Sequence, residues 1–146
     1  TDLNKLEEIL EEEIEYYKYL LTEKNMKITR KFEANSYLFS DKNAIHRLFS
    51  NLLANAINHS NRNSQIEVEI FKKDKNICFS IKNEYSGSKF REDIFKKNNF
   101  KQEEFGLGLY IVKKILKKIS GKIKIENTRN SLKFIIFLPT NLNRKR

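Results

Sequence analysis

Several features are absent from the sequence, and each absence excludes a class of protein. Cys78 is the single cysteine, which is too few for a disulfide or a cysteine-based metal cluster, so we expect a half-buried structural thiol. No apolar run approaches the length of a membrane span, and no signal peptide, internal repeat or interdomain linker is visible. With 146 residues and 39% hydrophobic content, the chain predicts one compact domain over residues 1–139 and a basic, disordered tail over residues 140–146.

The charge is strongly of one sign, and a net charge of +10 raises the question of a nucleic-acid partner. The positive residues are mostly lysines spread over several predicted elements. A protein that reads nucleic acid would be expected to concentrate arginine or aromatic residues on one element, and outside the short tail we see no such concentration. We therefore expect a solvated basic surface, with no nucleic-acid partner and no membrane contact.

Periodicity predicts an α+β fold in which hairpins and crossovers alternate. Apolar residues at helical spacing predict an N-terminal helix over residues 1–25, capped by Thr1 or Asp2, and Gly121 is a candidate C-cap for the last helix. Alternating patterns predict strands over residues 26–32, 37–39, 65–71, 77–82, 122–127 and 131–139. The expected architecture is a two-layer sandwich, with a mixed sheet of about five strands covered on one face by about three helices.

The stretch over residues 41–60 predicts one helix with two different faces, with Asp41 as its N-cap. Apolar residues recur every three or four positions, as in a helix that covers a sheet. Asn51, Asn55 and Asn58 recur at helical spacing along a neighbouring flank. Packing does not require asparagine, so this row is either a solvated polar face or a set of ligands.

A second stretch, residues 105–118, places glycines next to an apolar helical pattern. Gly106 and Gly108 immediately precede that pattern. We therefore expect a glycine-rich loop that opens a helix, with free N–H groups and a positive dipole end that face phosphate. One such glycine pattern is weak evidence, but its order after the asparagine helix and an intervening strand makes the combination specific.

Together, these stretches resemble the ATP-binding catalytic domain of sensor histidine kinases. NLLANAINHS is similar to the asparagine motif of that domain, and GLGLYIVKKI is similar to its second glycine motif. The resemblance covers about residues 3–139 and extends to the wider ATPase family of gyrase, the mismatch-repair ATPases and the heat-shock chaperones. It implies a Bergerat-type ATP-binding fold, ATP and Mg²⁺ as cofactors, and a role in two-component signal transduction.

The resemblance implies roles for individual residues at the phosphate end of the site. Asn55 matches the family's Mg²⁺-binding asparagine, and Asn51 would orient water or phosphate. His59 stands where a Tyr or His commonly meets phosphate, although a capping or surface role is equally open. Asn58 replaces a frequent Lys or Arg, which weakens that contact. The residues expected to bind nucleotide here are Asn51, Asn55, Asn58, His59, Gly106, Leu107, Gly108 and Leu109.

At the adenine end, the sequence departs from the family pattern. Alignment on the strand through Ile81 places Asn83 at the family's aspartate, with Tyr85 and Gly87 at its two glycines. Asn83 can accept a hydrogen bond from the adenine amino group, but it lacks the charge and the second acceptor oxygen of a carboxylate. Leu132 replaces the threonine usual in this part of the sheet. We expect Asn83 and Gly87 to bind nucleotide with reduced affinity.

The residue at position 51 distinguishes the possible mechanisms. Hydrolysing relatives and related serine kinases carry a glutamate there as general base, and Asn51 cannot act as one. A histidine acceptor needs no base, because neutral imidazole presents a lone pair. We therefore expect a cytoplasmic protein-histidine kinase domain that transfers the γ-phosphoryl group of ATP to a histidine on a separate dimerisation and phosphotransfer domain of the same parent protein, with a response regulator downstream. Membrane anchoring of the parent stays open.

Two alternatives remain. A degenerate, non-catalytic interaction module of the same fold is favoured by Asn83, Tyr85 and Leu132, because loss of motif residues leaves a fold intact. A related ATPase of the gyrase type is disfavoured by Asn51 and by the short chain. The fragment is expected not to phosphorylate itself, since neither His46 nor His59 lies on a pattern typical of the acceptor hairpin.

Overall fold

The computed structural model describes residues 1–84, 102–128 and 130–140, with residues 102–107 described by their backbone only. The helices are α1 (Leu6–Tyr16), α2 (Lys18–Glu23), α3 (Lys42–His59) and α5 (Gln102–Ile119). The strands are β1 (Asp2–Lys5), β2 (Lys27–Phe32), β3 (Tyr37–Ser40), β4 (Gln65–Lys73), β5 (Asn76–Glu84), β6 (Lys122–Asn127) and β7 (Ser131–Pro139). The predicted tail beyond Thr140 lies outside the described residues.

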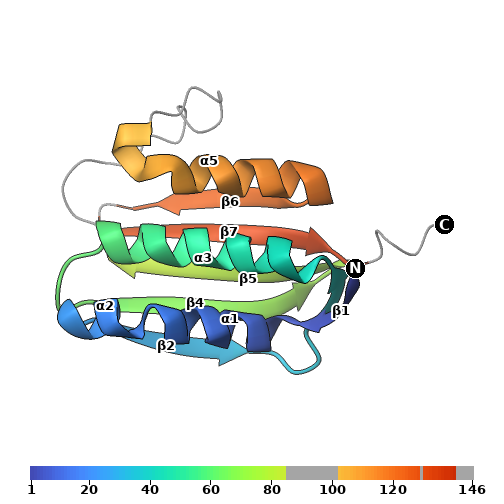
Figure 1. The fold of residues 1–146 in the computed structure, drawn as a ribbon, viewed down its shortest axis with the longest axis horizontal. Helices are drawn as coiled ribbons and strands as arrows, with labels where there is room; N and C mark the ends of the chain where they lie inside the picture. The colour runs from blue at the N-terminus through green and yellow to red at the C-terminus, as the bar shows by residue number, and fades with distance from the viewer. Residues whose placement is uncertain (85–101, 129, 141–146) are drawn as a thin grey trace.

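Five strands form one mixed sheet in the order β2, β4, β5, β7, β6, in which β2 and β4 are parallel and the other neighbours antiparallel. The helices α1, α3 and α5 lie side by side across one face of this sheet (Figure 1). The prediction of a two-layer α+β sandwich is therefore confirmed. The parallel pair is possible because β3 and α3 provide the long crossover that parallel neighbours require.

The core fills the space between the helices and the sheet. Ile66, Val68 and Ile70 of β4 are buried, as their alternation predicted. The ring of Phe49 in α3 lies 4.6 Å from that of Phe79 in β5, which fixes the central helix over the central strand. Asp41 caps α3 as predicted, since its side chain accepts a hydrogen bond from the Asn43 backbone N–H at 3.0 Å.

Cys78 is fully buried and not half-buried as predicted. The register places it directly between Phe71 of β4 and Phe137 of β7, on the sheet face that the helices do not cover. The two flanking rings are large enough to shield a small side chain from water. The thiol is therefore a packing residue of the outer face.

The N-terminal prediction of a single helix over residues 1–25 is wrong. The first residues form β1, which pairs with β3, and α1 begins only at Leu6, whose N–H donates to the Ser36 carbonyl at 3.0 Å. Helical spacing of the leucines cannot reveal this pairing, because the partner strand lies more than 30 residues away in sequence. A second break falls at Tyr17, between α1 and α2, where the tyrosine hydroxyl lies 2.8 Å from Ser50 Oγ.

The C-terminal end of α5 also differs from the prediction. Ser120, and not Gly121, takes the left-handed conformation, with φ of 62°, and the Gly121 N–H closes the helix by donating to the Leu116 carbonyl at 2.8 Å. Gly121 is required for a different reason. A Cβ there would lie 2.7 Å from Leu116 Cδ2 and 3.1 Å from the Phe137 carbonyl oxygen, so this glycine allows α5 to end close against β7.

Candidate nucleotide site

The asparagines of α3 differ sharply in their surroundings. Asn58 is exposed, and Asn51 is half-buried, with its Nδ2 donating to the Arg47 carbonyl one turn earlier at 2.7 Å. Asn55 is only 5% exposed. A solvated polar face therefore describes Asn58, and it is wrong for Asn55.

The buried amide of Asn55 has no hydrogen-bond partner for its nitrogen or its oxygen among the described residues. An unpaired buried polar group typically costs about 1–3 kcal/mol, so native structures rarely keep one without a reason. One such reason is a ligand or ion that is present when the protein works. The amide oxygen is a hard donor of the kind that Mg²⁺ accepts alongside waters and phosphate oxygens.

The glycine motif lies against the asparagine helix. A Cβ built on Gly108 would come within 3.2 Å of Asn51 Oδ1 and 3.7 Å of the Asn51 carbonyl oxygen. The close approach of α5 to α3 at this point therefore depends on a residue without a side chain. The two stretches that the sequence singled out are thus neighbours in space, although more than 50 residues separate them in the chain.

The prediction of a glycine-rich loop before the helix is wrong in the described structure. Gly106, Leu107, Gly108 and Leu109 all lie inside α5, which begins at Gln102. Glutamates at positions 103 and 104 favour a helix N-terminus at this place, and they extend the helix through the glycines at a cost of about 1 kcal/mol per glycine. Backbone N–H groups within a helix are bonded internally, except in its first turn.

His59 is the last residue of α3, and it is half-buried. Burial lowers the pKa of its imidazole, and the positive charge of Lys24 lowers it further. Lys24 follows α2 and donates its Nζ to the Ile57 carbonyl at 2.5 Å, near the C-terminal end of α3. No local pattern in the sequence could have placed Lys24 here, because it comes from a different element.

Asn83 ends the buried part of the central strand β5, and it is 2% exposed. It pairs with Ile66 of β4 and with Leu132 of β7, and Leu132 in turn pairs with Asn127 of β6. Directly paired residues share a sheet face, so these four side chains belong to the last row of the face that the helices cover, which Ile28 of β2 completes by pairing with Ile66. Asn127 was not among the predicted site residues, although its alternation with Ile123 and Ile125 could have placed it on this face. Tyr85 and Gly87 lie outside the described residues.

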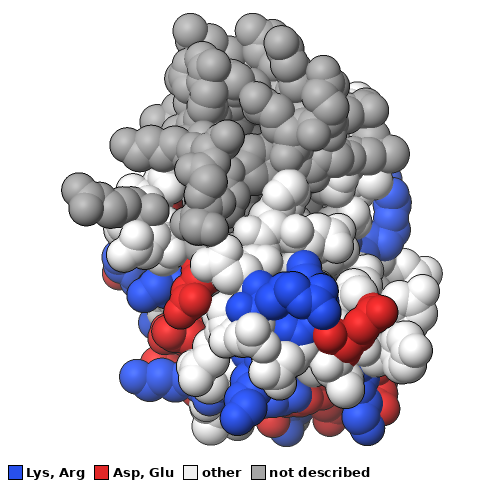
Figure 2. Space-filling model, turned by 90° about the vertical axis from the view of Figure 1, so that its left-hand side faces the viewer, with Lys and Arg blue, Asp and Glu red and all other residues white. Residues whose placement is uncertain are grey.

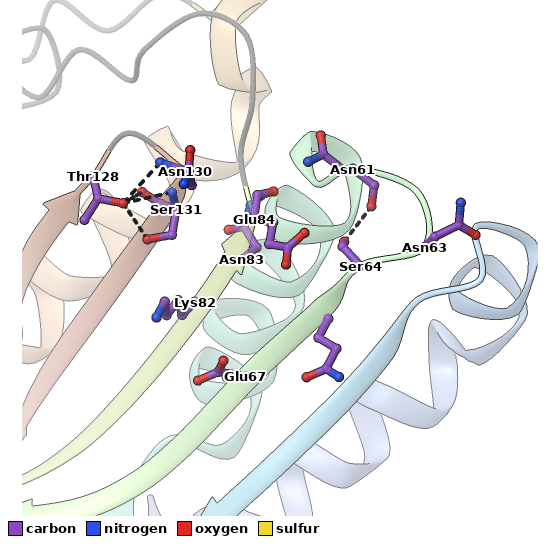
Figure 3. A pocket seen from close by; sticks show the side chains of 11 residues that line it. Asn61, Asn63, Ser64, Glu67, Lys82, Asn83, Glu84, Thr128, Asn130 and Ser131 are labelled. Carbon is purple, nitrogen blue, oxygen red and sulfur yellow. Dashed lines mark hydrogen bonds between the residues drawn. The ribbon is translucent and has the colours of Figure 1, made fainter.

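An open cavity of about 940 Å³ lies at the same end of the sheet, between the turn after α3 and the turn between β6 and β7 (Figure 3). Among the predicted site residues that the structure describes, Asn83 alone borders it. The described lining residues are all polar or charged: Asn61, Asn63, Ser64, Gln65, Glu67, Lys82, Asn83, Glu84, Thr128, Asn130 and Ser131. Asn51 and Asn55 of α3 do not line this cavity. We therefore define the candidate site by Asn55, Asn51, Gly108 and Asn83.

The surface at this end carries charges of both signs. Lys and Arg side chains lie among Asp and Glu side chains on the described part of the face (Figure 2). Within the described ranges, no group of three or more His, Cys, Asp or Glu residues is arranged to hold a metal ion. A metal at this site would therefore depend on amide oxygens and on oxygens of a bound ligand.

The fold agrees with the family that the sequence matches. Residues 40–142 match the family described as "Histidine kinase-, DNA gyrase B-, and HSP90-like ATPase". The chain belongs to this family of ATPases. Its relatives within the family are sensor histidine kinases of two-component systems.

Three relatives illustrate the similarity. The chain is 30% identical over 143 residues to the sensor histidine kinase CssS of Bacillus subtilis, and 32% identical over 145 residues to HprS of Escherichia coli; each alignment covers 94% of this chain. It is 35% identical over 103 residues, or 65% of this chain, to the heme sensor protein HssS of Staphylococcus haemolyticus, of which it covers 22%. The chain spans 30% of CssS and 31% of HprS.

Solved structures with the same fold include histidine kinases. The catalytic domain of the histidine kinase ThkA superposes with a TM-score of 0.81 at 25% identity, over 94% of both chains. ThkA in complex with the response regulator TrrA gives 0.81 at 24% identity, over 99% of this chain and 42% of that one. Full-length ShkA in complex with AMPPNP gives 0.77 at 16% identity, over 93% and 31%.

Proposed function

We propose that this chain binds Mg²⁺-ATP and presents its γ-phosphoryl group to a histidine on a separate dimerisation and phosphotransfer domain of the same parent protein. The observation that carries the proposal is the buried, unpaired amide of Asn55, one turn from the contact between Asn51 and Gly108. In the histidine kinase family this is the position of the metal-binding asparagine. A ligand oxygen or ion at Asn55 would remove the cost of the unpaired amide.

Asn55 would hold Mg²⁺, which when bound neutralises phosphate charge and polarises the group that is transferred. Asn51 and Asn58 would contact phosphate oxygens or bound water with their side-chain amides. His59 would contribute a neutral imidazole at pH 7, because burial and Lys24 lower its pKa. The N–H groups of residues 106–109 would face the phosphates once they are released from the helix.

This chain supplies positioning and electrostatic stabilisation and no general base. The amide of Asn51 cannot remove a proton from water, so rapid hydrolysis is not expected. Neither histidine of the chain is suited to be the acceptor. His46 contacts Glu13 at 2.6 Å and Glu12 at 3.1 Å, where α1 packs on α3, and His59 belongs to the proposed site.

The proposed partners follow from these roles, because this chain binds the nucleotide and does not carry the acceptor histidine. The acceptor histidine lies on another domain of the parent protein, and a response regulator acts downstream, as the ThkA–TrrA complex illustrates for a structural neighbour. We place the domain, residues 1–139, in the cytoplasm, where ATP is available. In the described ranges, no helix has the length and apolarity needed to cross a membrane.

A calorimetric titration with ATP, with and without Mg²⁺, tests the binding site. Asn55→Ala should weaken Mg²⁺-dependent binding by about tenfold or more, because the metal loses a ligand. Asn43→Ala is the matched control, since the same change falls on an exposed asparagine in the first turn of α3. Equal affinity of the wild type and Asn55→Ala, with both proteins folded as judged by circular dichroism, would contradict the proposal.

Radiolabelled ATP tests the transfer. Three samples are compared: the chain alone, the dimeric helical hairpin of the parent alone, and both together. We expect label only in the mixture, on histidine, as an acid-labile and base-stable phosphoryl group. Label on serine or threonine, or fast hydrolysis by the chain alone, would assign the chain to another branch of the family.

The second candidate function is a degenerate interaction module. It is favoured by the direct pairing of Asn83 with Leu132, because both departures from the family's adenine-binding pattern fall at one point of the sheet. Absence of any nucleotide binding in the titration would support this module over the kinase domain.

A further inference from the structure

At the end of the proposed site that would bind the purine base, the inner face of the sheet carries neutral side chains. The inner-face row formed by Ile66, Asn83, Leu132 and Asn127 contains two amides and two apolar side chains, and no charged residue among these described members. Asn83 is 2% exposed, and the side-chain oxygen of Asn127 is buried as well. A base that reaches this row therefore meets the neutral amide of Asn83, which also borders the open cavity at this end of the sheet.

An amide and a carboxylate read a purine edge differently. A 6-aminopurine presents an acceptor at N1 and a donor at its amino group, whereas a 6-oxopurine presents a donor at N1 and an acceptor at O6. A carboxylate offers acceptors only, and would leave O6 opposite a negative oxygen. The amide of Asn83 offers one donor and one acceptor side by side, so turning it over pairs either edge completely.

Little in the surroundings prevents this turn. The Asn83 Nδ2 donates to the carbonyl of the adjacent residue, Glu84, at 3.2 Å, which is at the long limit for such a bond. On the neighbouring strand, Leu132 is fully buried and has no polar atom that could hold the amide in one orientation. One neutral hydrogen bond is worth about tenfold in an equilibrium at most, which limits the preference for one edge.

We propose that Asn83 makes the site tolerant of the base, so that it accepts nucleoside triphosphates of both 6-amino and 6-oxo purines. This inference rests on the proposed nucleotide binding and adds the class of base to it. Asn83 is the specificity-determining residue, and Leu132 leaves its amide free to turn.

Titration with Mg²⁺-ATP and Mg²⁺-ITP tests the inference, because the two bases share one ring system and differ in the donor and acceptor pattern at N1 and position 6. Wild type should bind them within about tenfold of each other. Asn83→Asp should lower ITP affinity relative to ATP by about tenfold or more, because O6 then faces a carboxylate. Asn76→Asp, the same change at the opposite end of β5, is the matched control and should leave the ratio unchanged.

The possible outcomes separate the two proposals. Wild-type binding of ATP with ITP weaker by more than about tenfold overturns the base tolerance and leaves the nucleotide site standing. An unchanged ratio in Asn83→Asp, with the variant folded by circular dichroism, overturns the role of Asn83. Binding of neither nucleotide overturns both proposals. A shift of the ratio in Asn83→Asp alone supports the inference.

Discussion

Asn55 and Leu52 lie one turn apart in α3 and are both buried, yet their surroundings satisfy only the leucine. The leucine is stabilised by leaving water, whereas the asparagine amide loses its hydrogen bonds to water and gains none from the described residues. A residue that lowers stability and is nevertheless part of the fold is expected where function requires it.

Replacement of Asn55 by leucine should therefore separate stability from binding. We expect the free energy of unfolding without nucleotide to rise by about 1–3 kcal/mol, because the unpaired amide is removed. The stabilisation by Mg²⁺-ATP should disappear in the same variant. Urea denaturation with and without Mg²⁺-ATP measures both effects. A nucleotide-free variant less stable than wild type would show that the amide already bonds within the fold.

His59 should make the stability of the fold depend on pH. Its pKa is lowered first by burial and then by Lys24, so in the unfolded chain, where the pKa is about 6.5, it binds protons more readily. The contribution of His59 to the free energy of unfolding is therefore fully present above about pH 6.5. It is lost as the pH falls from there toward the lowered pKa of the folded state. His59→Gln should lose less stability than wild type between pH 7.5 and 5.5. Denaturation midpoints at the two pH values test this, and equal losses would contradict it.

Residue types at the site were predictable, but their environments were not. Helical spacing correctly grouped Asn51, Asn55 and Asn58 on α3, because spacing is a local property of the chain. The neighbour of Asn51 comes from α5, where a Cβ on Gly108 would lie 3.2 Å from Asn51 Oδ1, and helical spacing within α3 cannot reveal such a contact. The contribution of Lys24 was invisible for the same reason, since it acts from another element.

Elements with a strong local pattern were predicted correctly, and those with distant partners were not. The strand β4 alternates so clearly that the sequence places its inner face. The strand β1 forms because β3 pairs with it, and Leu3, which precedes α1, fits a helical period by coincidence. The start of α5 was mispredicted because glycines break helices only on average, and the neighbouring residues decide each case.

The helical state of Gly106 can be tested by substitution. Gly106→Ala should stabilise α5 by about 1 kcal/mol, since alanine is the better helix former. If the N–H groups of this segment bind phosphate, the first turns of the helix must open, and the same change should weaken ATP binding by about fivefold. Thermal unfolding and calorimetry measure the two effects. Gly108→Ala is the informative comparison, because the new Cβ would lie 3.2 Å from Asn51 Oδ1. We expect this variant to lose stability, whereas Gly106→Ala should gain it.

At the scale of the molecule, the matched family region is smaller than the unit that packs together. That region covers residues 40–142, whereas β2 and α1 precede it. Buried residues of α1, Leu6 and Leu10 among them, pack in the same core as α3, and β2 pairs along the edge of β4. The residues of the candidate site therefore depend on packing elements that lie outside the matched region.

A chain trimmed to residues 40–142 should fail to fold cooperatively. It would expose the apolar flank of α3 and the unpaired edge of β4, both of which favour aggregation. Circular dichroism and analytical ultracentrifugation of the trimmed chain test this, with a chain that lacks only residues 141–146 as the control. A monomeric, cooperatively unfolding product would contradict the expectation.

The same feature limits how such a domain can be exchanged between genes. A recombination that moved only residues 40–142 would carry every residue of the candidate site and leave behind one edge strand and the helix that covers α3. The recipient protein would then contain the site residues without the strand and the helix that pack against their elements. Successful exchange must include β2 and α1 as well, so the inherited unit is set by packing and is larger than the region that sequence similarity marks.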